Sequence, residues 1–543
     1  MRWWACSLRG LPRGFVSPSS VMANIVSARG AHRLFGMSSH PRRRCVDVQL
    51  SEDAAAELFS RLHQRSPRAP AAFLDSSDHA RTSAPQRSRY SILAFALGEA
   101  AESVHLPSGA AEWLAEAWVP DRRAPQRGPS FQLGWVGFIG YENQGRFFRA
   151  THAVVVDHHA GTAELQSLGE DPQWEAAVRE ELTAVAAHTG TQTGTPSPTP
   201  SPWWALSAGK SAGPPQNSGT NRPPAQAETH LSGAHRPLTE LSVRDGRQAY
   251  LAKIAAAQQQ IAAGNSYEVC LTTAVTARFA GSPWQAYLRL RRKNRAPFTQ
   301  YLHLPGRSVP EASDDVVVLS TSPERFVQIS PSGTIRSEPI KGTRPRGADA
   351  HDDARLRADL ASHPKDRAEN VMIADLVRND LSVFAVPGTL GTERLCAVET
   401  YPTVHQMVST ISARLAPGAD RARALAAAFP PGSMTGAPKI STMNILRQLE
   451  SGQRGPYSGA AGYFSTTGAC DLAVLIRTAV LSRTPSGGHR HFDGHREPGR
   501  DWDFHLGLGG AITADSVPEE EWQEVIAKSR GVLGALGAEF PAR

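Results

Sequence analysis

The two runs LAVLIRTAVL (Leu472–Leu481) and FHLGLGGAIT (Phe504–Thr513) indicate the fold most clearly. Both are mainly apolar, and the polar stretch Arg483–Asp503 separates them. Two such runs joined by a polar loop are typical of a β-hairpin, in which the strands lie antiparallel. We therefore expect an antiparallel sheet in the C-terminal half of the chain, with a long loop over Arg483–Asp503.

Around this hairpin, short apolar runs alternate with helical patterns. The sequence contains no Gly-x-Gly-x-x-Gly motif, no Walker loop and no regular strand–helix–strand period. This pattern favours an α+β fold built on largely antiparallel sheets. The further strand runs are DVVVLSTS (315–322) and RFVQIS (325–330), and the helical patterns cover 352–378, 420–429, 438–450 and 518–533.

The net charge of +7 is concentrated at the start of the chain. Residues 1–46 contain eight arginines, no lysine and no acidic residue, and removing these charges leaves the remainder at −1. We therefore expect no nucleic-acid partner, because such a partner needs a basic face on the folded body. No apolar run approaches the roughly 18 residues of a membrane helix, so no membrane partner is expected.

Composition divides the chain into segments. Residues 1–46 are expected to be a disordered tail, either a transit segment or the product of a mis-assigned start codon. Residues 188–238 contain nine prolines and suit a linker between an N-terminal region, 47–187, and a C-terminal region, 239–543. The five scattered cysteines fit a reducing compartment. We expect the cytoplasm, or an organelle if the tail is a transit segment.

Two sets of acidic residues are candidate metal ligands. Glu521, Glu524 and Lys528 share one face of the helix over 518–533, which Ser516 is expected to cap. Asp366 and Glu369 lie one turn apart in the helix over 352–378. Each set alone is more typical of a solvated surface. If the two sets meet, their carboxylates would suit magnesium.

The stretch RSEPIKGTRPRG (336–347) places Lys341 between an apolar Pro-Ile pair and a glycine, with three arginines nearby. Such an amine is either solvated or has a pKa lowered for chemistry. The stretch FPPGSMTGAPK (429–439) is a Gly/Pro-rich loop that runs into a helix. Its backbone N–H groups and the Thr435 hydroxyl could hold a carboxylate.

Taken together, these stretches resemble the motifs of the chorismate-utilising enzymes, in the same order along the chain. The resemblance covers about 246–533, and upstream FLDSS (73–77), RYSILAF (89–95) and GWVGFIGYE (134–142) are similar to the N-terminal half of the amino-transferring members. The motifs are SPERF (322–326), EPIKGTRPRG (338–347), KDRAENVMIADLVRNDLS (365–382), VETYPTVHQMVSTI (398–411), PPGSMTGAPK (430–439), RGPYSGAAGYF (454–464), LAVLIRTAVL (472–481) and GGAITADSVPEEEWQEVIAK (509–528).

The resemblance implies two packed, largely antiparallel sheets flanked by helices, with chorismate as substrate and magnesium as cofactor. It also assigns roles to residues of this chain. Glu369, Glu524 and Glu521 match the magnesium carboxylates, and Arg477 and Tyr457 match the clamp on a substrate carboxylate. Thr435, Gly462 and Gly509 would complete the pocket, Lys528 would neutralise charge, and His405 matches the histidine near the reacting ring.

Lys341 points to one branch of the family. Anthranilate synthases are similar here but carry alanine, whereas many aminodeoxychorismate synthases carry the lysine as a covalent nucleophile. In that role Lys341 must be neutral, so we expect burial, the metal, Arg344 or Arg346 to lower its pKa. Glu324 would be the general acid and later a base. The isochorismate and salicylate branches have a water-activating lysine at a position that here is Glu268.

The expected function is therefore the synthase subunit of aminodeoxychorismate synthesis, for p-aminobenzoate and folate. The sequence shows no Gly-x-Cys-x-Gly elbow, so we expect a separate glutamine amidotransferase to supply ammonia. Anthranilate synthase component I is the enzymatic alternative, and a silent chorismate-binding paralogue is the non-enzymatic one. A tryptophan-sized pocket lined by parts of 73–95 is also expected from the resemblance.

Overall fold

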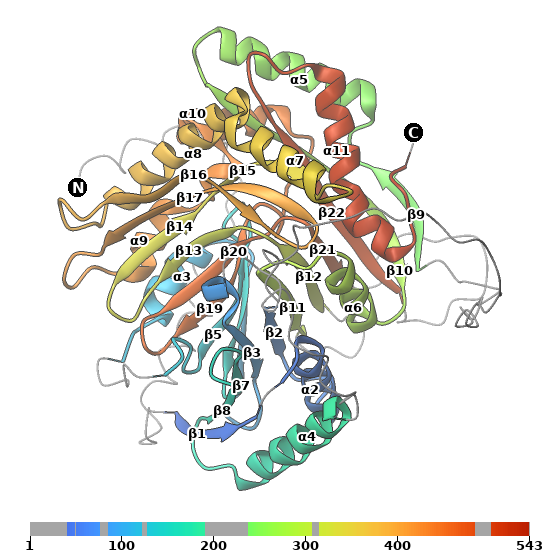
Figure 1. Ribbon diagram of the computed structural model, residues 1–543. Coiled ribbons are helices and arrows are strands. Elements are labelled where there is room, and N and C mark those ends of the chain that lie inside the picture. Colours follow the sequence, from blue (N-terminus) through green and yellow to red (C-terminus); the bar gives the residue numbers. More distant parts are fainter. Residues whose placement is uncertain are drawn as a thin grey trace, which may run out of the picture.

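A computed structural model describes residues 41–48, 50–76, 85–121, 128–190, 237–306, 314–483 and 501–541. Its strands form two sheets, each paired antiparallel, and helices gather at both ends of the molecule (Figure 1). The expected α+β fold of two packed antiparallel sheets is confirmed. Residues 1–40, 191–236 and 484–500 lie outside the described residues. Most of the expected tail and linker, and most of the expected loop over 483–503, fall there.

The larger sheet draws on both ends of the chain. β2 of the N-terminal region pairs with β11 of the C-terminal region, so the regions 47–187 and 239–543 share one sheet. Residues 42–46, expected in the tail, belong to the edge strand β1. In order, the strands are β1 (Arg42–Asp47), β8 (Thr162–Ser167), β7 (His152–Asp157), β3 (Tyr90–Phe95), β2 (Ala71–Asp75), β11 (Phe298–Leu304), β12 (Val316–Ser322), β21 (Thr478–Ser482), β22 (Asp501–Ile512), β10 (Glu268–Ala280) and β18 (Gly436–Ala437), with β9 (Leu238–Val243) on β10.

The smaller sheet is also shared, because β19 pairs with β5. It faces the larger sheet across a buried apolar layer, in which Val155 and Val318 of one sheet pack with Val136 and Phe148 of the other. In order, its strands are β15 (Ile340–Pro345), β17 (Val404–Arg414), β14 (Thr334–Glu338), β13 (Arg325–Ile329), β20 (Cys470–Val474), β19 (Ala460–Ser465), β5 (Gly134–Ile139), β6 (Gly145–Ala150) and β4 (Glu102–Leu106), with β16 (Gly391–Thr400) on β17.

The expected hairpin forms, but one of its two runs is divided between the sheets. β21 pairs with β22, whereas Leu472–Val474 belong to β20 in the smaller sheet. The chain crosses from one sheet to the other at Arg477, whose φ of 50° is rare for a residue with a side chain. The expectation of a single strand over 472–481 is therefore wrong, because the run passes through two buried layers.

One end of the molecule is covered by the helices α5, α7, α8, α10 and α11 (Figure 1). The helices expected over 420–429, 438–450 and 518–533 are confirmed, but the pattern over 352–378 forms two helices. Pro364 begins the second, because the residue before a proline is extended and here ends the first. The helices are α2 (Glu52–Arg65), α3 (Ala110–Ala117), α4 (Pro172–Gly190), α5 (Arg247–Ala262), α6 (Pro283–Lys293), α7 (Ala350–Ser362), α8 (Pro364–Ser382), α9 (Arg421–Ala428), α10 (Lys439–Leu449) and α11 (Pro518–Leu533), with 3₁₀ turns η1 (Pro85–Ser88), η2 (Gly432–Met434) and η3 (Gly534–Leu536).

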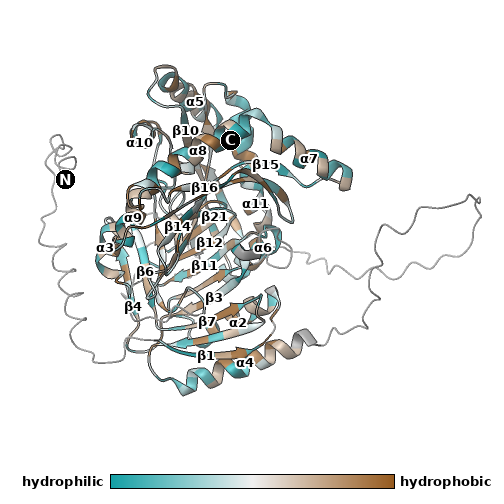
Figure 2. Cartoon of the chain, turned by 60° about the vertical axis from the view of Figure 1, so that its left-hand side comes forward, coloured by the Kyte–Doolittle hydropathy of each residue, from teal (hydrophilic) through white to brown (hydrophobic). Residues whose placement is uncertain are grey.

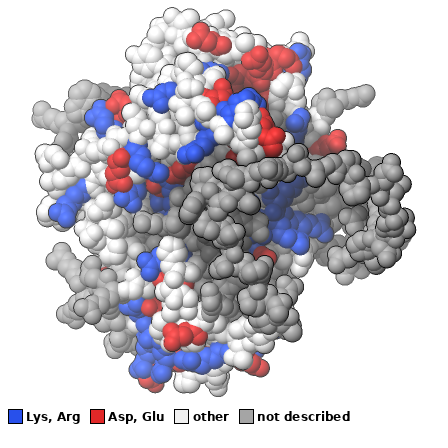
Figure 3. Space-filling model, in the orientation of Figure 1, with Lys and Arg blue, Asp and Glu red and all other residues white. Residues whose placement is uncertain are grey.

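The opposite end is covered by α2 and α4. Both hydrophobic and hydrophilic residues line α4 (Figure 2), and its Val178 and Leu182 are buried in one core cluster with Leu58 and Phe59 of α2. On the face shown in Figure 3, acidic and basic side chains of the described residues are interspersed. None of the described helices is both long enough and apolar enough to cross a membrane.

Candidate functional site

Lys341 and Glu268 form an ion pair between the two sheets. Lys341 lies on β15, at a bulge between Ile340 and Thr343 in the pairing with β17. A bulge redirects side chains, and Gly342, with a φ of 88°, supplies the left-handed residue. Glu268 is the first residue of β10 and is fully buried. The Lys341 Nζ donates to Glu268 Oε1 at 2.5 Å.

The structure contradicts the expectation that the pKa of Lys341 is lowered. Burial alone would lower it, but the charge of Glu268, supported by Cys270 and Glu369, outweighs burial and leaves the pKa of Lys341 above its ordinary value. The expected cationic neighbours are neutralised by carboxylates. Arg344 Nε lies 2.7 Å from Asp359, and Arg346 Nε lies 2.7 Å from Asp353.

Glu324 has the environment of a general acid. It lies between β12 and β13, is 4% exposed, and accepts a hydrogen bond from Ser433 Oγ at 2.6 Å. Burial raises the pKa of Glu324 to about 7, against the opposing effects of Ser433 and of the positive charge of Lys341. A carboxyl group with this pKa can hold a proton near neutral pH and donate it to a leaving group.

The carboxylates expected to bind magnesium approach one another from two helices. Lys365 Nζ lies 3.9 Å from Glu369 of α8 and 3.9 Å from Glu521 of α11. Burial raises the pKa of Glu369 to about 7. Lys528 Nζ lies 2.6 Å from Glu524. Among the described residues, no three His, Cys, Asp or Glu side chains are grouped closely enough to hold a metal.

The chemistry of this donor set nevertheless fits magnesium. Oxygen ligands suit the ion, which keeps several waters and often takes only one or two carboxylates from a protein. Ser516 supports the set in a way the sequence did not indicate. Its Oγ donates to Glu521 Oε1 at 2.6 Å, so it does not cap α11, and Val517 is the N-cap residue.

Of the residues expected to bind a substrate carboxylate, Tyr457 is buried and Arg477 is half-buried. Burial lowers the pKa of Arg477, and no hydrogen bond or ion pair of its guanidinium occurs within the described part of the chain. Burial raises the pKa of Tyr457, whose ring lies so close to Gly507 that a Cβ there would be 2.1 Å from it. Lys528 Nζ donates to the carbonyl of Gly509 at 2.9 Å, so these two residues meet.

Three further residues of the expected substrate site, Thr435, Gly462 and His405, make contacts with other parts of the protein. The Thr435 hydroxyl donates to the Gly432 carbonyl at 3.0 Å, and Gly462 lies within the ladder between β5 and β20. His405 is fully buried, with one ring nitrogen 3.0 Å from Thr400 Oγ1 and the other 3.0 Å from Asp353. In this arrangement neither ring nitrogen of His405 is open to a ligand. Its catalytic role stays a prediction.

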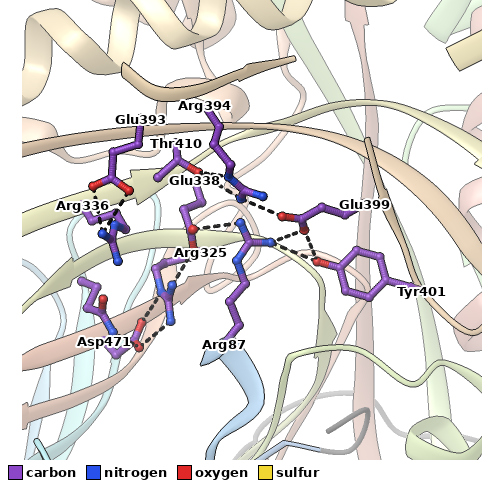
Figure 4. A network of polar contacts seen from close by, with 11 residues as sticks. Arg87, Arg325, Arg336, Glu338, Glu393, Arg394, Glu399, Tyr401, Thr410 and Asp471 are labelled. Carbon is purple, nitrogen blue, oxygen red and sulfur yellow. Dashed lines mark hydrogen bonds and ion pairs between the residues drawn. The ribbon is translucent and has the colours of Figure 1, made fainter. Parts of the chain in front are cut away.

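A cavity of about 130 Å³ lies between the two sheets. A tryptophan-sized pocket was expected from parts of 73–95, and the lining of this cavity includes Leu74, Asp75, Ser76, Arg87, Arg89, Tyr90 and Ile92. Ligand binding there stays a prediction. A network of buried ion pairs borders it (Figure 4). Arg87 contacts Glu338 at 2.8 Å and also pairs with Glu399, while Arg325 contacts Asp471 at 2.9 Å and also pairs with Glu338.

Comparison with known proteins gives matches along most of the chain. It is 41% identical over 429 residues to aminodeoxychorismate synthase of Streptomyces griseus, covering 76% of this chain and 51% of that protein. It is 40% identical over 292 residues to aminodeoxychorismate synthase component 1 of Klebsiella aerogenes, covering 53% of this chain and 58% of that protein. The chain thus spans about half the length of the curated relatives it matches.

A solved structure supports the fold. Anthranilate synthase component I of Streptococcus pneumoniae superposes with a TM-score of 0.57 at 22% identity, covering 82% of this chain and 92% of that one. The family described as chorismate binding enzyme matches residues 70–534, which include the smaller sheet, the larger sheet except β1, and every candidate site residue named above. The chain belongs to the chorismate binding enzyme family.

Proposed function

We propose that this protein is the synthase subunit of an aminodeoxychorismate synthase, which replaces the C4 hydroxyl of chorismate with an amino group. The observation that carries the proposal is the buried amine of Lys341 in the same site as Glu324, a carboxyl group with a pKa of about 7. The similarity to proteins named aminodeoxychorismate synthase supports it.

Chorismate carries two carboxylates, and the site offers cationic groups for both. The guanidinium of the half-buried Arg477 has no hydrogen-bond or ion-pair partner among the described residues, and together with Tyr457 it would bind one of the two carboxylates. Glu369, Glu521 and Glu524 would hold magnesium, which when bound supplies positive charge for the ring carboxylate. Lys528 would offset the negative charge of Glu524.

The amination would proceed by two displacements with Lys341 as nucleophile. The neutral amine forms a bond to C2, the two ring double bonds shift, and the C4 hydroxyl leaves as water with the proton of Glu324. Ammonia then forms a bond to C4, the double bonds shift back, and the C2–nitrogen bond to Lys341 breaks. Glu324 takes the proton released by the new amino group.

Ammonia would come from a separate glutamine amidotransferase, and the product would feed p-aminobenzoate and folate synthesis in the cytoplasm. The Klebsiella relative is named component 1, which supports the existence of a second component.

Product analysis tests the proposed function. Incubation of the full chain with chorismate, magnesium and a high concentration of ammonium is expected to yield 4-amino-4-deoxychorismate without release of pyruvate. The products would be separated by chromatography. Anthranilate with pyruvate would instead assign the protein to anthranilate synthesis, and unchanged chorismate would favour a silent paralogue.

The rate of adduct formation is expected to fall about tenfold per pH unit above about pH 7, because Glu324 must hold a proton when the hydroxyl leaves. Its pKa is raised, so the protonated form is lost as the pH rises through that value. Single-turnover reactions without ammonia measure this step alone. The variant E324Q should be slow at every pH and lack this alkaline decline. If the rate of E324Q declined at alkaline pH as the wild-type rate does, the decline would have to come from another titrating group.

A further inference from the structure

Glu268 has a buried carboxylate of which only one oxygen accepts a hydrogen bond within the described residues. Its backbone carbonyl accepts from Ser266 Oγ at 2.9 Å, and it opens the strand β10 beside β18. Its Oε1 accepts from Lys341 Nζ at 2.5 Å. Its Oε2 is buried and has no hydrogen-bond partner within the described residues. An unpartnered oxygen of this kind is costly for a group whose only task is structural.

A nearby pair shows what a structural ion pair looks like in this protein. Arg454 and Glu450 are both buried, and Arg454 Nε donates to both carboxylate oxygens of Glu450 at 3.2 and 2.9 Å. Glu450 also accepts from the backbone N–H and the hydroxyl of Thr272. The Lys341–Glu268 pair has a single hydrogen bond between the two side chains and leaves one oxygen open.

We propose that Glu268 is the positioning residue that removes a proton from Lys341 and so makes it nucleophilic. This inference rests on the proposed function. The carboxylate lies at hydrogen-bond distance from the nitrogen that must lose a proton before it can attack.

The proton balance closes over one turnover. The Lys341 ammonium gives one proton to the Glu268 carboxylate, which becomes a carboxylic acid, and the freed electron pair of nitrogen forms the bond to C2. When ammonia has taken C4 and the C2–nitrogen bond breaks, Lys341 leaves as a neutral amine. Glu268 then returns the proton to it, and the resting ion pair is restored.

Several charged or titratable groups surround this pair. Cys270 lies on the same strand, Glu369 faces it from α8, Glu524 from α11, and Glu324 from the segment between β12 and β13. These groups act on Lys341 through their charge, and within the described part of the chain none of them forms a hydrogen bond with its amine. Glu268 is therefore the group placed to take the proton directly.

The ratio of wild-type to E268Q rates tests the inference. Single-turnover adduct formation is measured without ammonia between about pH 6 and pH 9, so that the effect of Glu324 cancels in the ratio. In E268Q the proton must go to solvent. We expect the variant to be at least about a hundredfold slower at pH 7, with the ratio shrinking by about tenfold per pH unit.

Two further variants complete the design. E268D keeps a carboxylate and should be slower than the wild type with the same pH dependence, which keeps the test decisive if E268Q does not fold. E393Q removes an exposed glutamate that pairs with Arg336, and should match the wild type. A ratio near one, a pH-independent ratio, or a steep slope in E268D would overturn the inference. A wild type that makes no aminodeoxychorismate would instead overturn the proposed function.

Discussion

Replacement of Lys341 by alanine is expected to lower aminodeoxychorismate formation by about a thousandfold or more, the scale on which loss of a nucleophile acts. The Lys341 side chain is only 11% exposed and its amine is held by Glu268 at 2.5 Å, so an exposed lysine elsewhere cannot take its place. The variant should still bind chorismate, because Arg477 and the carboxylates of α8 and α11 are unchanged. Initial rates with saturating ammonium measure the effect.

Arginine at this position separates charge from nucleophilicity. K341R keeps a cation opposite Glu268, but a guanidinium does not lose its proton in proteins, so this variant should be as inactive as K341A. K253A is a matched control, because Lys253 is also a lysine in an ion pair, 2.6 Å from Asp245, and lies outside the site. It should retain the wild-type rate. Amination by K341R at a rate near that of the wild type would contradict the assigned role.

The second large effect concerns stability. R325A is expected to lower the free energy of unfolding by about 3–5 kcal/mol, as when one partner of a buried ion pair is removed. Arg325 is 5% exposed and pairs with both Asp471 and Glu338 (Figure 4). Without it, Asp471 loses its ion-pair partner, and Glu338 keeps only Arg87. Urea denaturation followed by fluorescence would show the shift in midpoint.

The neighbouring strand offers a matched control for this variant. Arg336 lies on β14 and pairs with Glu393 at 2.8 Å, but both side chains are more than one-third exposed. Exposed pairs contribute about 0–1 kcal/mol, so R336A should leave the denaturation midpoint almost unchanged. Equal shifts for R325A and R336A would show that the network does not act as a buried unit.

Local patterns in the sequence predicted the secondary structure well where the whole patterned segment belongs to a single helix or sheet. The helices over 420–429, 438–450 and 518–533 agree with α9, α10 and α11. The run over 472–481 was misleading because both of its halves are buried, in different sheets, and hydropathy does not distinguish the two layers. The break at Arg477 could be found only from its backbone angle.

The candidate site was predictable from motifs, but its electrostatics were not. The sequence places Arg344 and Arg346 beside Lys341, yet each is neutralised by an aspartate of α7 or α8. The residue that controls the charge of Lys341 is Glu268, 73 positions away along the chain. Its one sequence signal is an acidic residue at the start of the apolar strand EVCLTTAV, and no local pattern connects it to Lys341.

The central claim is that Lys341 forms a covalent bond to the substrate. Mass spectrometry of the full chain after incubation with chorismate and magnesium, but without ammonia, tests it most directly. The account predicts a mass increase equal to chorismate less one water, located on the peptide that contains Lys341 and lost when ammonium is added. An unmodified chain that nevertheless gives aminodeoxychorismate as soon as ammonium is added would contradict it.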